Sequence, residues 1–371
     1  MTKFIGLSLF SSGGLSETYL DKTKVDIKLA NELIKDRCKF YKHLYPNSNI
    51  INGSITDKDI YEQIIKEAKK LKVDFILATP PCQGMSKAGK MKVDDDRNIL
   101  FLYVINIIKE LKPKYILIEN VPEFLKSNYI NPETNNSENI LDKIKKELGN
   151  KYNFDYNKLN SMDYEVPQSR NRAIMILSKK RLPVWKLPKK LVIDIKTVKD
   201  IIYNLPSLES NEKVRDKLSD DSELLNNINL IKWHNAKKHN DNHILWMKNT
   251  STGETAFNNE VHYPKKDGRM IKGFKTTYKR IKWDTPAPTI TMSSGSISSQ
   301  NNVHPGRKKD DNTYSDARVL TVYEIILLTS LPYNWNIPDF ATDKLIRDLV
   351  GECVPPKFMY HLIKSIPTIE F

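Results

Sequence analysis

The chain contains 371 residues, 39% of them hydrophobic, and its formal net charge at pH 7 is +14. This length can bury a sizeable core and allows one large domain with a smaller one, while the lack of a membrane-spanning apolar run excludes an integral membrane protein. Three cysteines without a pairing pattern, and no signal-peptide pattern, favour a reducing cytoplasm over a disulfide framework, and we expect no metal site.

The positive charge fits a polyanionic partner such as nucleic acid. However, Lys outnumbers Arg, and Asn and Ile are abundant, a bias that an AT-rich genome produces without selection for binding. The position of the charge along the chain must therefore decide between these interpretations.

The chain begins with a pattern typical of a cofactor-binding unit. Residues 4–10 form an apolar strand, residues 11–14 form a turn of small residues, and a helical pattern starts near Leu15. Small residues let the backbone approach a ligand and leave N–H groups at a helix N-terminus free to bind it. A tight turn without a ligand is an equally good interpretation of this segment taken by itself.

Two further strands are predicted at residues 25–30 and 50–55. The first is followed by Glu32, and a carboxylate at the end of the second strand of such a fold can accept hydrogen bonds from a ribose diol. A surface glutamate at a strand end is the competing interpretation.

A fourth strand, residues 75–78, leads into two prolines and Cys82. Two consecutive prolines prevent both ladder pairing and helix formation, so the chain must turn there and place the thiol at the carboxyl edge of a parallel sheet. The alternative is an inert buried cysteine. The polar, lysine-rich residues 84–96 that follow are predicted to form a mobile loop that closes over substrate, or else a solvated connector.

The next elements are an amphipathic helix ending near Leu111 and a buried strand that ends in Glu119. A strand-end glutamate is usually solvated or caps a helix. Two more strands, at 155–159 and 173–177, flank a segment carrying Arg170 and Arg172, and arginines two residues apart on extended chain point the same way.

After Leu182 the alternation of strands and helices stops. Residues 260–309 contain eleven Lys and Arg residues against three acids, interleaved with aromatic residues. This combination favours a nucleic-acid surface, with a solvated lysine-rich face as the alternative.

Several of these segments together resemble the motifs of the cytosine-C5 DNA methyltransferases, in the order of that family. Pro80-Pro-Cys-Gln83 resembles the nucleophile motif, Glu119-Asn-Val121 the acid motif, and Gln168-x-Arg-x-Arg172 the arginine motif. Residues 10–15 resemble the first motif, Phe-x-Gly-x-Gly-Gly. Residues 286–291 and 318–324 resemble the ninth-motif region, and residues 349–355 the last motif.

The chain departs from the family pattern at three places. Ser12 and Leu15 replace glycines of the first motif, Ser54 replaces an aspartate that accepts from adenine, and Glu352-Cys353 replace Asn-Ser. A serine still permits close approach at position 12, and a serine oxygen at position 54 can still accept a hydrogen bond.

The resemblance implies a catalytic group of Cys82, Glu119, Arg170 and Arg172. In the implied reaction the Cys82 thiolate adds to C6 of cytosine, Glu119 stabilises charge at N3, and Arg172 stabilises charge at O2. Because the target carbon is inaccessible inside a duplex, the base must be flipped out.

The implied methyl donor is S-adenosylmethionine. The residues implied to bind it are Phe10, Ser12, Gly13, Leu15, Glu32, Ser54, Ile55, Pro81, Leu100 and Val354. The implied DNA contacts are Gln83, Ser86, Lys87, Arg269, Lys272, Lys275 and Arg280, with Lys279 as a further phosphate contact. Arg269 and Arg280 are the two whose planar guanidinium groups could read guanine edges.

We therefore expect a Rossmann-like α/β methyltransferase domain with a mostly parallel sheet, plus a smaller irregular DNA-recognition domain. The first covers residues 1–181 and is completed by 341–371, and the second covers residues 182–340. The resulting hypothesis is a cytoplasmic monomer that acts on double-stranded DNA and has a cognate restriction endonuclease as a separate partner. A tRNA cytosine-C5 methyltransferase and a catalytically silent DNA-binding protein are the alternatives.

Overall fold

The computed structural model describes residues 3–81 and 96–369. The chain divides into two compact units, one of Met1–Asn160, Asn171–Lys190 and Phe358–Phe371, the other of Ser161–Arg170 and Leu191–Lys357. This division differs from the boundaries expected from the sequence. Residues 182–190 fall in the first unit, whereas residues 161–170 and 341–357 fall in the second.

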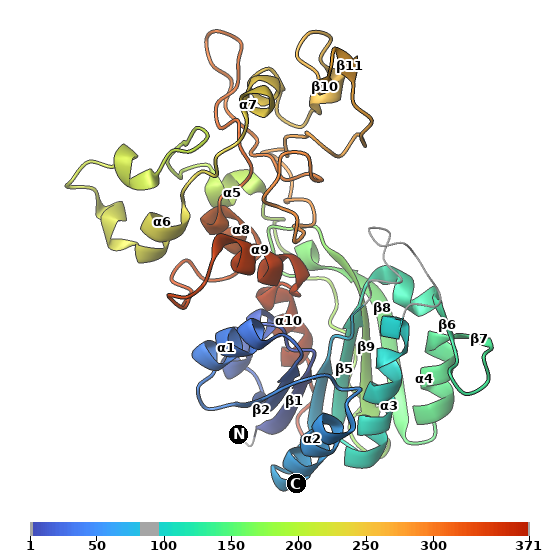
Figure 1. Ribbon diagram of the computed structural model, residues 1–371. Helices are drawn as coiled ribbons and strands as arrows, with labels where there is room; N and C mark the ends of the chain where they lie inside the picture. The colour runs from blue at the N-terminus through green and yellow to red at the C-terminus, as the bar shows by residue number, and fades with distance from the viewer. Residues whose placement is uncertain (1–2, 82–95, 370–371) are drawn as a thin grey trace. The chain divides into compact units, whose positions relative to one another are not determined.

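The first unit is built on a seven-stranded sheet with the order β3-β2-β1-β4-β5-β9-β8 (Figure 1). Strands β1 to β5 are parallel, and β9 and β8 are antiparallel additions at one side. The strands are β1 Phe4–Leu9, β2 Val25–Glu32, β3 Asn49–Asn52, β4 Phe75–Ala78, β5 Tyr115–Asn120, β8 Tyr152–Asn160 and β9 Asn171–Lys179, with a separate hairpin of β6 Asn128–Ile130 and β7 Ser137–Asn139.

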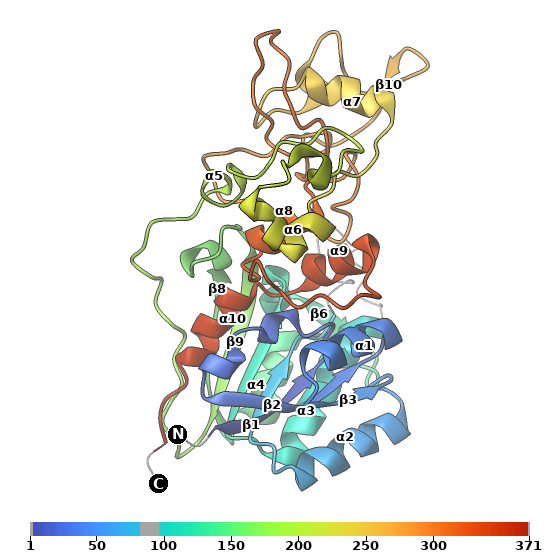
Figure 2. The ribbon, with the colours of Figure 1, turned by 90° about the vertical axis from the view of Figure 1, so that its left-hand side faces the viewer.

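Helices α2, α3 and α4 lie side by side over one face of this sheet (Figures 1 and 2). Strands β4 and β5 are buried along their whole length, which explains why they read as continuous apolar runs rather than alternating ones. Alternate strand residues, such as Leu7, Ile76 and Ile116, join the apolar face of α3 in one core. The helices of this unit are α1 Lys35–Leu44, α2 Lys58–Lys70, α3 Leu100–Leu111 and α4 Ile140–Leu148.

The opposite face of the sheet is covered by Trp185 and the C-terminal segment. Phe75 and Tyr115 point to this face, and their rings contact the Trp185 ring at centroid distances of 6.2 and 6.1 Å. The Trp185 indole N–H donates to Ser365 Oγ at 2.8 Å. Residues near the end of the chain thus complete the unit that starts at its beginning.

The second unit has little regular structure. Apolar clusters among its described residues include one around Trp246 and one around Leu230. A buried ion network lies between short segments, in which Arg318 pairs with Asp316 and Glu324, and all three side chains are fully buried. Its elements are α5 Val198–Ile202, α6 Ile228–Trp233, α7 Asp241–Lys248, β10 Lys265–Lys266, β11 Arg269–Met270, α8 Val322–Leu328 and α9 Asp343–Glu352, and α10 Pro356–Lys364 leads back to the first unit.

The mixed α/β architecture with a mainly parallel sheet confirms the fold class expected from the sequence. Across residues 3–81 and 96–369, no helix combines the length and the apolar character needed to cross a membrane.

Candidate active site

The loops after the five parallel strands meet at one edge of the sheet of the first unit. Leu9 pairs in register with Asn31 of β2 and with Ala78 of β4, and Ala78 pairs with Ile118 of β5. The turn after β1, Glu32 and the Pro-Pro turn after β4 are therefore neighbours, and Glu119 is the second-last residue of the next strand, β5.

The turn after β1 has a strained backbone held by Glu32. Phe10, Ser12 and Gly14 all have positive φ angles, of 58, 50 and 77°. Glu32 is buried, and its two carboxylate oxygens accept from the backbone N–H groups of Ser12 at 2.9 Å and Ile34 at 2.8 Å. The position where the family motif has its first glycine is thus one where a left-handed conformation favours glycine, and Ser12 adopts it nevertheless.

The same turn carries a polar atom that lacks a partner. Ser12 Oγ is buried and forms no hydrogen bond with the described residues. A ligand group that reaches this turn could satisfy it, and each Glu32 oxygen keeps a second lone pair for a ligand hydroxyl. These groups fit a small polar cofactor at this sheet edge.

A buried carboxyl group lies directly behind the turn. Glu17, at the end of a 3-10 helix at Leu15–Glu17, is 4% exposed and accepts from Tyr41 Oη at 2.7 Å. Tyr45 Oη donates to the Gly14 carbonyl at 2.8 Å, and a Cβ at Gly14 would lie 2.5 Å from the Tyr45 ring. Burial raises the pKa of Glu17 to about 7, against hydrogen bonds from Ser8 and Tyr41 that lower it. The sequence analysis missed this group, because no local pattern signals that a glutamate after a turn is buried.

The loop after β3 carries Ser54 and Ile55, two further residues that are expected to bind the cofactor. Ser54 Oγ is 2.8 Å from Thr56 Oγ1 and also accepts from the Thr56 N–H at 3.3 Å. Ile55 is buried. The Ser54 hydroxyl thus forms its hydrogen bonds within its own loop. The longer aspartate that the family has at this position would place its carboxylate farther out.

The Pro-Pro turn is tied to both neighbouring strands. Buried Asn120 donates its Nδ2 to the Pro80 carbonyl at 3.0 Å, and Thr79 Oγ1 donates to the Phe10 carbonyl at 3.1 Å. Asn120 belongs to the Glu-Asn-Val motif but was given no role from the sequence. The expected nucleophile Cys82 and the expected DNA contacts Gln83, Ser86 and Lys87 lie outside the described residues.

Glu119 and Arg172 are brought together by the antiparallel pairing of β5 with β9. Arg172 Nε lies 2.8 Å from Glu119 Oε1, and the side chains are 13% and 9% exposed. Arg172 also donates to the Asn171 carbonyl. Because Glu119 is nearly buried and paired with Arg172, its carboxyl group is held in one orientation, in which it can donate or accept a proton.

Arg170 differs from its sequence prediction. It precedes β9 and belongs to the second unit, so the two-residue strand period does not align it with Arg172. It is 2% exposed, and its guanidinium group donates to the carbonyls of Ile290, Gly351 and Glu352. The expected alignment of Arg170 with Arg172 is therefore corrected: Arg170 braces backbone within its own unit, and the catalytic role expected for it stays a prediction.

The DNA contact expected for Arg280 is also corrected. Rather than offering a planar face to DNA, it is fully buried in the second unit. Its donors are all directed at backbone carbonyls, those of Met247, His304, Ser315 and Asp316. A guanidinium group satisfied in this way has no donor left to read a base edge.

Three other described cations that are expected to contact DNA are exposed. Arg269 lies in β11, and Lys272 and Lys275 follow it, all three exposed, whereas Lys279 is half-buried. Val354 is buried in the second unit. Leu100 begins α3 in the first unit, and its side chain packs partly buried against the sheet core.

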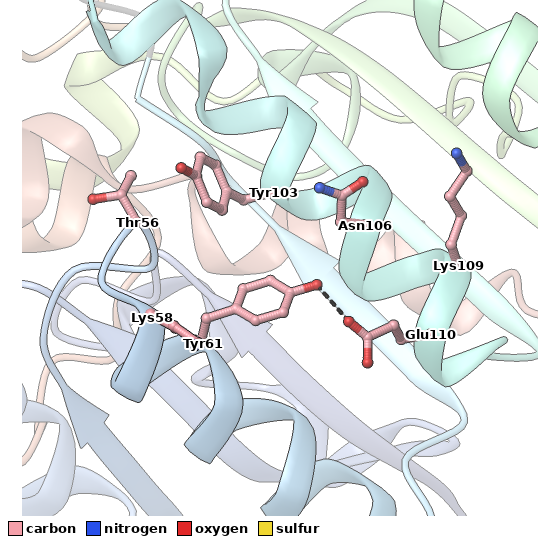
Figure 3. Close-up of a pocket in the computed structure, with 7 residues that line it drawn as sticks. All are labelled: Thr56, Lys58, Tyr61, Tyr103, Asn106, Lys109 and Glu110. Carbon is pink, nitrogen blue, oxygen red and sulfur yellow. Dashed lines mark hydrogen bonds between the residues drawn. The ribbon is translucent and has the colours of Figure 1, made fainter.

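A hollow of about 550 Å³ lies between α2 and α3, and Thr56, the hydrogen-bond partner of Ser54, is one of the residues that line it (Figure 3). Tyr61 of α2 donates to Glu110 of α3 at 2.9 Å across it. None of the residues expected to bind cofactor lines it, so the candidate site is the sheet edge and not this hollow.

The family model described as C-5 cytosine-specific DNA methylase matches residues 4–368. The chain belongs to this family. The expected resemblance is thereby confirmed over almost the whole sequence, the middle segment included.

Individual relatives agree with this membership. The chain is 46% identical to the Type II methyltransferase M1.HgaI of Avibacterium volantium, over 98% of both chains. It is 26% identical to the Type II methyltransferase M1.HphI of Haemophilus parahaemolyticus, over 97% of this chain and 86% of that protein.

Among solved structures, the chain resembles Spodoptera frugiperda DNMT2, with a TM-score of 0.59 and 20% identity over 98% of this chain and 99% of that one. It also resembles a prophage-encoded E. coli protein described as a DNA modification methyltransferase, with a TM-score of 0.68 and 21% identity over 98% of both chains. These likenesses support the methyltransferase fold.

Proposed function

We propose that this C5 methyltransferase transfers a methyl group from S-adenosylmethionine to C5 of a flipped cytosine in a specific duplex DNA site, as the modification enzyme of a restriction-modification system. The Glu119–Arg172 pair at the edge of the parallel sheet carries the proposal, since an acid and a cation are held there in fixed geometry. The two relatives compared above are both Type II methyltransferases, which favours DNA over tRNA as substrate. We propose that the protein acts as a monomer and that its cognate endonuclease is a separate protein.

The proposed chemistry begins with addition of the Cys82 thiolate to C6, which forms a C–S bond and moves electron density toward N3 and O2. Glu119 would hold a proton at N3, and Arg172 would stabilise charge at O2 while orienting Glu119. After methylation, loss of the C5 proton and breakage of the C–S bond restore the aromatic ring. Asn120 would orient the turn that presents the thiol, through Pro80.

The turn after β1 fits S-adenosylmethionine, which when bound supplies an electrophilic methyl group. Ser12 Oγ offers an unsatisfied hydroxyl, and Glu32 offers lone pairs to a ribose diol. The recognition role is assigned to the second unit, whose exposed cations Arg269, Lys272 and Lys275 would contact the duplex.

The test uses duplex DNA carrying 5-fluorocytosine at the methylated position, found beforehand by bisulfite mapping. Wild-type protein with cofactor should form an adduct that survives denaturation, because fluorine cannot leave as a proton does. Cys82→Ala should form none. An equal yield of adduct in Cys82→Ala would assign the nucleophile elsewhere, and methylation of purified tRNA but not DNA would overturn the choice of substrate.

A further inference from the structure

The β10–β11 hairpin and the turn that follows it form an exposed surface of unusual composition in the second unit. Apart from the two turn residues of the hairpin, its exposed residues are cationic or apolar, with Met270 54% and Phe274 73% exposed. The exposed cations of this surface, here called the hairpin surface, are Lys265, Lys266, Arg269, Lys272 and Lys275.

The hairpin surface is strongly cationic, because its five cations face a single exposed acid, Asp267. Lys266 lies directly opposite Arg269 in the two-residue ladder, which places like charges across a strand pair and costs folding energy. Among the part of the chain that the structure describes, none of the five cations forms a salt bridge. A tight turn at Asp267 and Gly268, with φ angles of 51 and 76°, fixes this arrangement. Such a surface is complementary to a polyanion.

Phe274 is held outward by ordered structure. The N–H and the hydroxyl of Thr277 both donate to the Phe274 carbonyl, at 2.9 and 2.8 Å, which closes the turn. The backbone at Gly273 lies against Phe257, where a Cβ would come within 2.5 Å of the ring, and Phe257 packs on Tyr278 of the unit's core. The turn is thus anchored on its inner side, and the exposure of Phe274 follows from the fold.

We infer that Phe274 inserts into the base stack of duplex DNA while the flanking lysines hold the phosphates. Apolar side chains placed among cations act as wedges between base steps, and an aromatic ring can stack on any base. A second copy of this chain is a poorer occupant, because the net positive charge of five cations and one acid would repel its own copy. This inference rests on the proposed function, since it needs duplex DNA as substrate.

The experiment compares full-length Phe274→Ala with wild type on a duplex containing the mapped methylation site. Affinity should fall roughly 5- to 150-fold, as expected for loss of one stacked ring, while the slope of log affinity against log salt stays unchanged. Lys272→Ala should show the opposite pattern, with the slope reduced by about 1. Ile228→Ala, which removes a side chain that is 77% exposed on α6, is the matched apolar control and should bind like wild type.

Phe274→Trp supplies a direct readout. Its added indole should restore affinity, and its fluorescence should be quenched on DNA binding beyond the change seen with wild type. The inference is wrong if Phe274→Ala binds within twofold of wild type, or if that change instead dissociates a dimer in sedimentation. Failure of wild-type protein to bind or methylate duplex DNA would overturn the proposed function itself, so the two failures are distinct.

Discussion

The buried carboxyl group of Glu17 should make the stability of the first unit depend on pH. Burial raises its pKa from the ordinary value of 4.5 to about 7. In the unfolded chain the same group ionises near 4.5. Between these two values the folded protein keeps a proton that the unfolded chain has released, so raising the pH favours unfolding.

The magnitude follows from the difference of about 2.5 between the two pKa values. At about 1.36 kcal/mol per pKa unit, the folded state loses about 3 kcal/mol as the pH rises from below 4.5 to above 7. Glu17→Gln has a neutral side chain of the same shape that can still accept from Tyr41. This variant should match wild type near pH 4.5 and exceed it by up to about 3 kcal/mol at pH 8.

Urea unfolding of wild type and Glu17→Gln at a series of pH values measures this difference, because contributions from all other titrating groups cancel between the two proteins. Glu62→Gln, which alters a carboxylate on α2 that is 64% exposed, is the matched control and should show no such trend. If the stability difference between Glu17→Gln and wild type is the same at pH 5 and pH 8, Glu17 does not change its proton in this range and the argument fails.

Three further predictions concern single contacts. Glu119→Gln should bind DNA and cofactor nearly normally but lose turnover, whereas loss of stability with intact activity per folded molecule would indicate a structural role. Asn120→Ala should leave the buried Pro80 carbonyl without its donor, which should lower the free energy of unfolding by about 1–3 kcal/mol. It should also slow adduct formation at Cys82. An unchanged rate of adduct formation would mean that Asn120 does not position the turn. Arg280→Met should destabilise the second unit by at least about 3 kcal/mol, because it removes the donors of buried carbonyls. Arg269→Ala should leave stability unchanged and weaken DNA binding. The reverse pattern in melting and binding assays would show that Arg280 contacts DNA rather than supporting the fold.

Much of the first unit could be predicted because its signals are local. The apolar runs at 75–78 and 115–120 are fully buried strands, and the prolines after the first of them end the strand at Ala78 as expected. Glu119 was singled out because Glu119-Asn-Val121, directly after an apolar strand, resembles the acid motif of the family.

What could not be predicted depends on contacts between segments distant in sequence. Nothing near Arg280 shows that the carbonyls of residues 304 and 315 will surround its guanidinium group, so its charge was interpreted as exposed. The same holds for Glu17, whose burial depends on Tyr41 packing behind the turn. In a unit with few helices and strands, backbone carbonyls left without ladder partners need other donors, and buried arginines supply them.

The motif from Gln168 to Arg172 contributes side chains to both units. Gln168 accepts from the Ile290 N–H and donates to Thr329, and Arg170 donates to the Ile290 carbonyl, so both side chains order the backbone of the second unit. Two residues later β9 has begun, and Arg172 engages Glu119 of β5. A short motif can therefore fix the end of one unit and supply a side chain to the candidate site of the other, because the chain passes from irregular to strand backbone between its two arginines.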